Sequence, residues 1–150
     1  MIKLEYVFHI NVNVDRPIEV GRVGKGVRKI IPITGGDFDG ETLQGKILPG
    51  GADYQIIRSD GVTELIAQYT LQTEDGTFIN VTNQGYRHGP KDIIEKLAKG
   101  IKVPDDSYYF KTTPVFEVDN EKFAFLNRNI FIGVGTREPS HVKIAYYQVL

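Results

Sequence analysis

The feature that most constrains this chain is the alternation of apolar and polar residues with a period of two. The clearest run is Leu4–Val14. Successive side chains of a β-strand point to opposite faces, so such a run is typical of a strand with one buried face. Further strands are predicted at Lys29–Ile33, Thr42–Leu48, Asp53–Arg58, Thr63–Thr73, Thr77–Asn83, Tyr108–Glu117, Lys122–Asn127, Ile130–Thr136 and His141–Val149. Short strands separated by Gly, Pro, Asp and Asn indicate an all-β fold, an antiparallel sandwich or barrel.

One segment departs from this alternation. In Pro90–Lys99 the apolar residues Ile93, Ile94 and Leu97 recur at helical spacing, and Gly100 follows as a stop signal. We therefore expect one short α-helix, which either closes an open end of the sheet or packs against its outside. No internal repeat or linker divides the chain, and a length of 150 residues predicts one domain, 1–150.

The composition excludes several classes of function. The net charge of −1 provides no electrostatic basis for binding nucleic acid or an anionic membrane. No apolar run approaches the 18 residues of a membrane span. The absence of cysteine excludes disulfides and thiolate chemistry and fits a cytoplasmic protein. His9, His88 and His141 lack metal-ligand spacing, so we expect no metal site, and no motif predicts a bound cofactor.

The loops in RSDGV (58–62) and TEDGT (73–77) determine which residues share a face of the sheet. Two-residue turns would mix polar and apolar residues on both faces. Three-residue loops with a left-handed glycine separate them, and we expect this arrangement. Asp53 then pairs with Ala67, which also pairs with Asn83. The inner face carries Ile57, Leu65, Ala67, Leu71, Ile79 and Val81 with the polar residues Asp53, Gln55, Tyr69 and Asn83, while Arg58 points outward.

Several stretches also resemble a known family. They are PITGGDFDGETLQGKILPGGADYQIIRSDG, YTLQTEDGTFINVTNQGYRHGP, YYFKTTPVFEV and FLNRNIFIGVGTR. Over about Leu4–Val149 the chain is similar to the domain of unknown function 3237 family, also called uncharacterised protein family 0311. The resemblance implies a single antiparallel β-barrel of lipocalin-like or allene-oxide-cyclase-like shape. It implies no activity, and therefore no catalytic residues.

The inward polar residues have two interpretations. Asp53, Gln55, Tyr69 and Asn83 are either a structural hydrogen-bond network or the polar groups that orient a ligand in an otherwise apolar pocket. If the site is catalytic, Asp53 is the candidate general base, because burial raises the pKa of a carboxyl group. Tyr69 is then the candidate donor to a developing oxyanion, with Asn83 assisting. This set suits isomerisation, cyclisation or enolisation of a carbonyl compound.

The segment GYRHG (85–89) is expected just past a strand end, at the mouth of the barrel. There Arg87 either holds a ligand carboxylate or pairs with a nearby acidic residue, and His88 is either a proton shuttle or an ordinary loop residue. Gly133 and Gly135 are expected to leave room for a β-bulge or for a ligand.

Three functions follow from these expectations. The leading prediction is that the barrel binds a small, mainly apolar organic molecule, with Asp53, Gln55, Tyr69, Asn83 and Arg87 as ligand-binding residues. The alternative is an isomerase- or cyclase-type enzyme that uses Asp53 and Tyr69. The third is a structural or oligomerising barrel with a filled interior. A homodimer is also possible, because an exposed edge strand would need covering.

Overall fold

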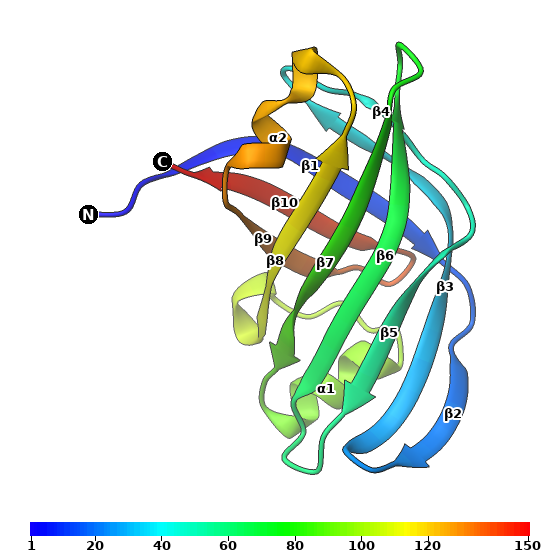
Figure 1. Ribbon diagram of the computed structural model, residues 1–150. Coiled ribbons are helices and arrows are strands. Elements are labelled where there is room, and N and C mark those ends of the chain that lie inside the picture. The colour runs from blue at the N-terminus through cyan, green and yellow to red at the C-terminus, as the bar shows by residue number, and fades with distance from the viewer.

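The computed structural model describes residues 1–150 as an antiparallel β-barrel (Figure 1). Its strands are β1 (Leu4–Val14), β2 (Ile18–Val23), β3 (Gly26–Gly40), β4 (Gly45–Ile47), β5 (Gly51–Ile57), β6 (Thr63–Thr73), β7 (Phe78–His88), β8 (Tyr109–Val118), β9 (Phe131–Arg137) and β10 (Val142–Val149). They are hydrogen-bonded in the order β1-β10-β9-β8-β7-β6-β4-β3-β2, and β5 pairs with β3 and β6. The pairing of β1 with β3 closes the barrel, as the sequence predicted.

The two Asp-Gly loops adopt the expected three-residue form. The N–H of Arg58 donates to the carbonyl of Val62 over 2.9 Å, and Gly61 takes a φ of +87°. The second loop repeats this arrangement around Gly76, at φ +89°. Asp53 therefore pairs with Ala67, and Ala67 with Asn83, which confirms the predicted register.

The barrel interior is divided between two apolar clusters. The larger contains aromatic rings in edge or tilted contact, including Phe8, Phe116, Phe131 and Tyr146. The smaller contains Leu65, Leu97, Val103, Tyr108 and Phe110. Most of the aromatic residues of the C-terminal third are therefore core residues.

Helix α1 (Lys91–Ala98) confirms the one predicted helix and lies across the barrel end opposite the short helix α2 (Phe125–Arg128) (Figure 1). Its apolar face places Leu97 in the smaller cluster. Gly100, at φ +75°, ends the helix: its N–H donates to the Leu97 carbonyl, and the N–H of Ile101 donates to the Lys96 carbonyl over 2.9 Å. These two bonds satisfy carbonyls that the helix terminus would leave unpaired.

The predicted strand Lys122–Asn127 is wrong. This segment forms a 3-10 turn, η2 (Glu121–Phe123), and a short helix, α2 (Phe125–Arg128). The N–H of Lys122 donates to the Asn120 side chain over 3.0 Å, which starts the turn. A second 3-10 turn, η1 (Asp105–Ser107), precedes β8.

Other segments also differ from prediction, and of the predicted strand Thr42–Leu48 only β4 (Gly45–Ile47) is a strand. Strand β2 was not predicted, and β3 is much longer than Lys29–Ile33. Five of the six β2 residues are exposed and the sixth is half-buried, so no buried face imposes alternation on this edge strand.

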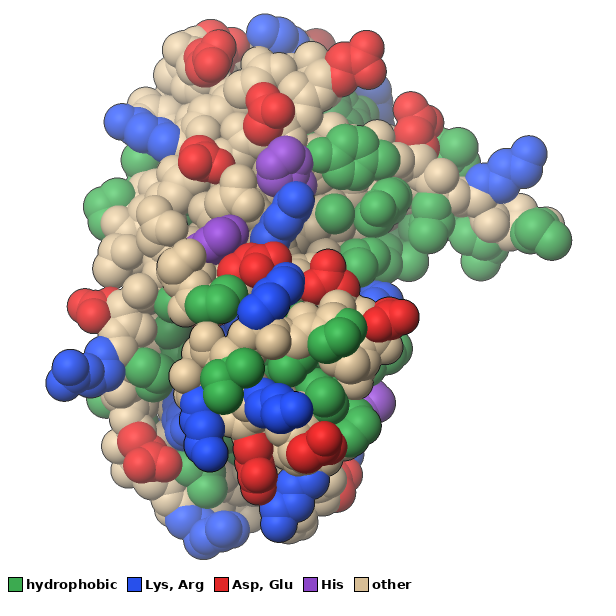
Figure 2. Space-filling model, turned by 180° about the vertical axis from the view of Figure 1, so that it is seen from behind, with side chains coloured by type: hydrophobic (Ala, Val, Ile, Leu, Met, Phe, Trp, Pro, Cys, Tyr) green, Lys and Arg blue, Asp and Glu red, His purple; other side chains and the backbone are tan.

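The two chain ends lie beside one another and project from the barrel (Figures 1 and 2). Leu4 pairs with Val149, and the N–H of Leu150 donates to the carbonyl of Lys3. Several apolar side chains of these ends are exposed, among them Ile2, Leu4, Tyr6 and Leu150. None of the helices has the length and apolar character that crossing a membrane requires.

Candidate functional site

A cavity of about 100 Å³ lies inside the barrel. Most of its wall is apolar, and its polar lining comes from five different parts of the chain. Exposed Asp15 and Pro17 mark its rim, next to β1. The lining residues are Val12, Val14, Asp15, Pro17, Ile31, Ile33, Asp53, Gln55, Leu65, Ala67, Tyr69, Asn83, Arg87, Phe110, Arg137, Val142 and Ile144.

The cavity brings together all five residues that the sequence nominated for ligand binding, on three adjacent strands. Asp53 and Gln55 come from β5, Tyr69 from β6, and Asn83 and Arg87 from β7. Residues of one strand that are an even number of positions apart point to the same face, and this holds for Asp53 and Gln55 and for Asn83 and Arg87. Their placement agrees with the predicted register, and their role in binding stays a prediction.

Asp53 is the only carboxylate deep inside the cavity. Its Oδ2 accepts a hydrogen bond of 2.8 Å from the Gln55 amide, while its Oδ1 is buried and has no partner. Burial raises the pKa of Asp53 above its usual value of 3.8, although Gln55, Arg87 and Arg137 act in the opposite direction. Desolvation therefore outweighs the neighbouring cations, and the carboxyl group is suited to accept a proton.

Tyr69 and Tyr146 form a buried pair of hydroxyl groups 2.8 Å apart. Burial is the main reason that both pKa values lie above the ordinary tyrosine value, so both groups are neutral hydrogen-bond donors at neutral pH. Asn83 lies near this pair and slightly offsets the rise at Tyr146. Neither polar atom of the Asn83 amide has hydrogen-bond geometry to any protein group, although the residue is fully buried.

Arg87 lies within β7, so the prediction that it follows a strand end is wrong. The strand continues to His88 because it pairs with β6 on one side and β8 on the other. Arg87 is 8% exposed, and its guanidinium lies 5.4 Å from the centre of the Phe110 ring. Burial and the neighbouring Arg137 lower the pKa of Arg87 to about 10, and it remains a cation at neutral pH.

Arg137 is a cavity residue that the sequence analysis missed. It is half-buried at the end of β9, and burial lowers its pKa. A signal for it was present, because Phe131, Gly133, Gly135 and Arg137 are spaced two apart and the first three are buried. His88, by contrast, is exposed and stacks on Tyr109, so it lies away from the cavity.

The glycines of β9 leave room for side chains rather than for a bulge or a ligand. A Cβ on Gly133 would lie 2.1 Å from the Thr112 hydroxyl, and one on Gly135 would lie 2.6 Å from the Phe110 ring. No register shift interrupts the pairing of β9 with β10. Gly135 thus allows Phe110 to lie against β9 and to form part of the cavity wall.

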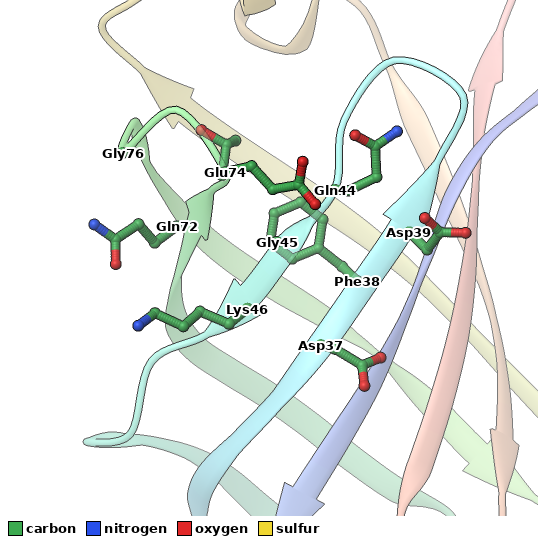
Figure 3. Close-up of a pocket in the computed structure, with 10 residues that line it drawn as sticks. Asp37, Phe38, Asp39, Gln44, Gly45, Lys46, Gln72, Glu74 and Gly76 are labelled. Carbon is green, nitrogen blue, oxygen red and sulfur yellow. The ribbon is translucent and has the colours of Figure 1, made fainter.

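A larger hollow of about 590 Å³ lies outside the barrel, along β3, β4 and β6 (Figure 3). The side chains that line it, among them Asp37, Asp39, Lys46 and Glu74, point in different directions and do not converge on one point. Asp37 already accepts a hydrogen bond from Asn11, and the one hydrophobic lining residue is Phe38. A ligand there would remain largely hydrated, so the internal cavity is the better candidate. No group of three or more His, Cys, Asp or Glu side chains is arranged to hold a metal ion.

Comparisons with known proteins agree with this architecture. A relative from Rhodopseudomonas palustris (strain TIE-1), a UPF0311 protein, is 41% identical over 149 residues, which are 99% of this chain and 97% of the relative. The crystal structure of a conserved protein of unknown function, RPA1785 from Rhodopseudomonas palustris, is 39% identical, with a TM-score of 0.95 and coverage of 100% of this chain and 99% of that one.

A more distant structure has the same fold. The crystal structure of an enzyme from Penicillium herquei is 20% identical, with a TM-score of 0.75, and the alignment covers 99% of this chain and 95% of that one.

The family model described as "Protein of unknown function (DUF3237)" matches residues 2–149. The chain therefore belongs to the DUF3237 family, as the resemblance of its sequence predicted.

Proposed function

We propose that the internal cavity binds a small, mainly apolar organic molecule. The observation that carries the proposal is the convergence of polar groups without protein partners on one apolar cavity. The buried atoms without a partner are the Asp53 Oδ1 and both polar atoms of the Asn83 amide, and the side chains of Arg87 and Arg137 line the same cavity without an ion pair. An unpaired buried polar group costs about 1–3 kcal/mol, so a set of them in one place indicates groups that await a ligand.

The size of the cavity sets the scale of the ligand. An apolar cavity of about 150 Å³ in another protein holds benzene. A cavity of about 100 Å³ is smaller than that, so a ligand with the dimensions of a substituted benzene also requires movement of the rim at Asp15 and Pro17. The same cavity argues against a barrel whose interior is completely filled.

A neutral aromatic probe tests this proposal. Benzamide is titrated into protein with ¹³C-labelled methyl groups, and the methyl resonances of Leu65, Val142 and Ile144 are followed by NMR. We expect saturable shifts at these cavity residues. The Ala67→Leu substitution fills the cavity and is expected to abolish the shifts, whereas Ala145→Leu, in which residue 145 faces away from the core, serves as the matched control. Shifts that survive Ala67→Leu, or no shifts in the unaltered protein, would contradict the proposal.

An isomerase- or cyclase-type enzyme is the second candidate, favoured by one observation. Asp53 combines a raised pKa with a free Oδ1 inside the cavity, which the neutral hydroxyl-bearing side chain of Tyr69 also lines. Such a carboxylate is suited to remove a proton next to a carbonyl group, and a tyrosine hydroxyl to stabilise the resulting oxyanion. The description of the Penicillium herquei protein as an enzyme is compatible with this candidate.

Proton exchange tests the second candidate separately. Acetophenone is incubated with the protein in D₂O, and loss of the methyl proton signal is measured by NMR. Catalysed exchange that Asp53→Asn abolishes, with acetophenone binding retained, would support the enzyme. Bound acetophenone without faster exchange would count against Asp53 as a base for ketone enolisation.

A further inference from the structure

Two guanidinium groups enter the cavity from strands on either side of β8. Arg87 comes from β7 and Arg137 from β9, and Phe110 of β8 lies against Arg87. Both are near enough to Asp53 for its charge to influence their pKa values, and Arg137 lowers the pKa of Arg87. Two like charges therefore line the same partly desolvated cavity.

Neither arginine has an anionic partner in the protein. The ion pairs of the structure involve Lys25, Arg58, Lys102 and Lys122 and include neither Arg87 nor Arg137. Asp53 accepts its one hydrogen bond from Gln55. Asp15, the other acidic residue of the cavity, is exposed at the rim and accepts from the backbone N–H of Arg16.

An unpaired arginine in such a position is costly for the free protein. Buried charges in folded proteins are ordinarily paired, yet Arg87 is buried and Arg137 half-buried without an ion pair, so a ligand that supplies negative charge would stabilise both. A guanidinium presents its N–H groups as a planar fork that matches the two oxygens of a carboxylate.

We propose that the ligand is a small apolar carboxylic acid whose carboxylate is held by Arg87 and Arg137. This inference rests on the proposed ligand-binding function. The apolar body of the acid lies against the aliphatic wall formed by residues such as Ile33, Val142 and Ile144. The Asp53 Oδ1 and the Asn83 amide remain available for a second polar group, such as a hydroxyl or carbonyl, elsewhere on the same molecule.

Benzoate and benzamide test this assignment because they have nearly the same shape and differ in charge. Affinities of both probes are measured by the methyl NMR titration described above, at neutral pH. We expect benzoate to bind about tenfold or more tightly than benzamide, the effect of a charge-assisted hydrogen bond in a water-poor site. Arg137→Met is expected to remove this preference while leaving the affinity for benzamide within about threefold. Arg87→Met should do the same, and Arg22→Met, which removes an exposed charge, should change neither affinity.

The outcomes separate this inference from the proposal on which it rests. Equal affinity for benzoate and benzamide in the unaltered protein would overturn the carboxylate assignment and leave ligand binding intact. A preference for benzoate that survives both Arg87→Met and Arg137→Met would overturn the assignment of these two residues. Failure of both probes to shift the cavity methyl resonances would overturn the assignment and the proposed function together. The amide spectrum of each variant shows whether it is folded.

Discussion

Replacing Arg87 with methionine is expected to make the free protein more stable. An unperturbed arginine has a pKa of about 12.5 or higher, and each pKa step corresponds to about 1.36 kcal/mol. Since the pKa of Arg87 falls to about 10, its charged form is about 3 kcal/mol less favourable in the cavity than in water. Methionine keeps an apolar side chain against Phe110 and removes the charge.

We expect the free energy of unfolding to rise by about 1–3 kcal/mol, because Asp53 loses one of its two neighbouring cations and this offsets part of the gain. For a chain of this length, a change of 1 kcal/mol shifts the melting temperature by about 2–4 °C. The pKa of Arg87 is lowered in the folded state, so its cost is fully present at every pH well below about 10. The gain should therefore be the same at pH 6 and pH 8.

Urea unfolding followed by far-UV circular dichroism measures this change, with an unchanged m-value as the sign that both states are comparable. Arg22→Met, on the exposed strand β2, is the control and should lie within about 0.5 kcal/mol of the unaltered protein. A loss of 1 kcal/mol or more in Arg87→Met would refute the reasoning, because it would mean that the guanidinium stabilises the barrel through a partner in the protein.

Three other substitutions test neighbouring parts of the account. Because folding raises the pKa of Asp53, ionisation of this carboxyl group destabilises the folded protein as the pH rises from about 4 to 7. The free energy of unfolding of Asp53→Asn should therefore fall less over this range than that of the unaltered protein. Parallel pH profiles of the two proteins would contradict this. Tyr69→Phe should cost about 1–3 kcal/mol in urea unfolding by leaving the Tyr146 hydroxyl unpaired, and the double variant with Tyr146→Phe should regain part of that loss; additive losses would count against the pair. Leu97→Ala should cost about 2–5 kcal/mol by leaving a space under α1, and a change below 0.5 kcal/mol would show that this helix does not hold the smaller cluster.

The residues on the inward face of the sheet could be predicted, because the length of the loops and the alternation of apolar and polar residues constrain each other. Once the Asp-Gly loops have three residues, the positions of Asp53, Gln55, Tyr69 and Asn83 follow from the period of two. Their hydrogen-bonding state did not follow, because it depends on distances between strands remote in sequence. Sequence alone therefore left a structural network and a ligand pocket as equal alternatives.

The errors have identifiable physical causes. The polar run around Arg87 resembles a loop in composition, yet pairing with two neighbouring strands keeps it extended. In Lys122–Asn127, alternation of apolar residues predicted a strand, but the side chain of Asn120 caps a helical turn at this point. Phe123 and Leu126 reach the core from helical turns instead. Arg137 was missed because Gly133 and Gly135 were interpreted as room for a β-bulge or a ligand, and not as inward-facing positions that continue to Arg137.

Two further expectations, the homodimer and the cytoplasmic location, also stay predictions. The exposed apolar residues at the projecting chain ends, such as Leu4 and Leu150, are compatible with a homodimer, and measurement of the mass in solution would test it. A cytoplasmic location is a prediction that the sequence analysis made because cysteine is absent.

The most direct test of the central claim is a high-resolution crystal structure of the protein crystallised with benzoate. The account predicts density for the ring inside the barrel, against Val142 and Ile144, with both carboxylate oxygens within hydrogen-bonding distance of the Arg87 and Arg137 guanidinium groups. An interior without benzoate at saturating concentration, in which both arginines instead form ion pairs with Asp53, would contradict it. The polar residues of the cavity would then form the structural network that the sequence left as the alternative.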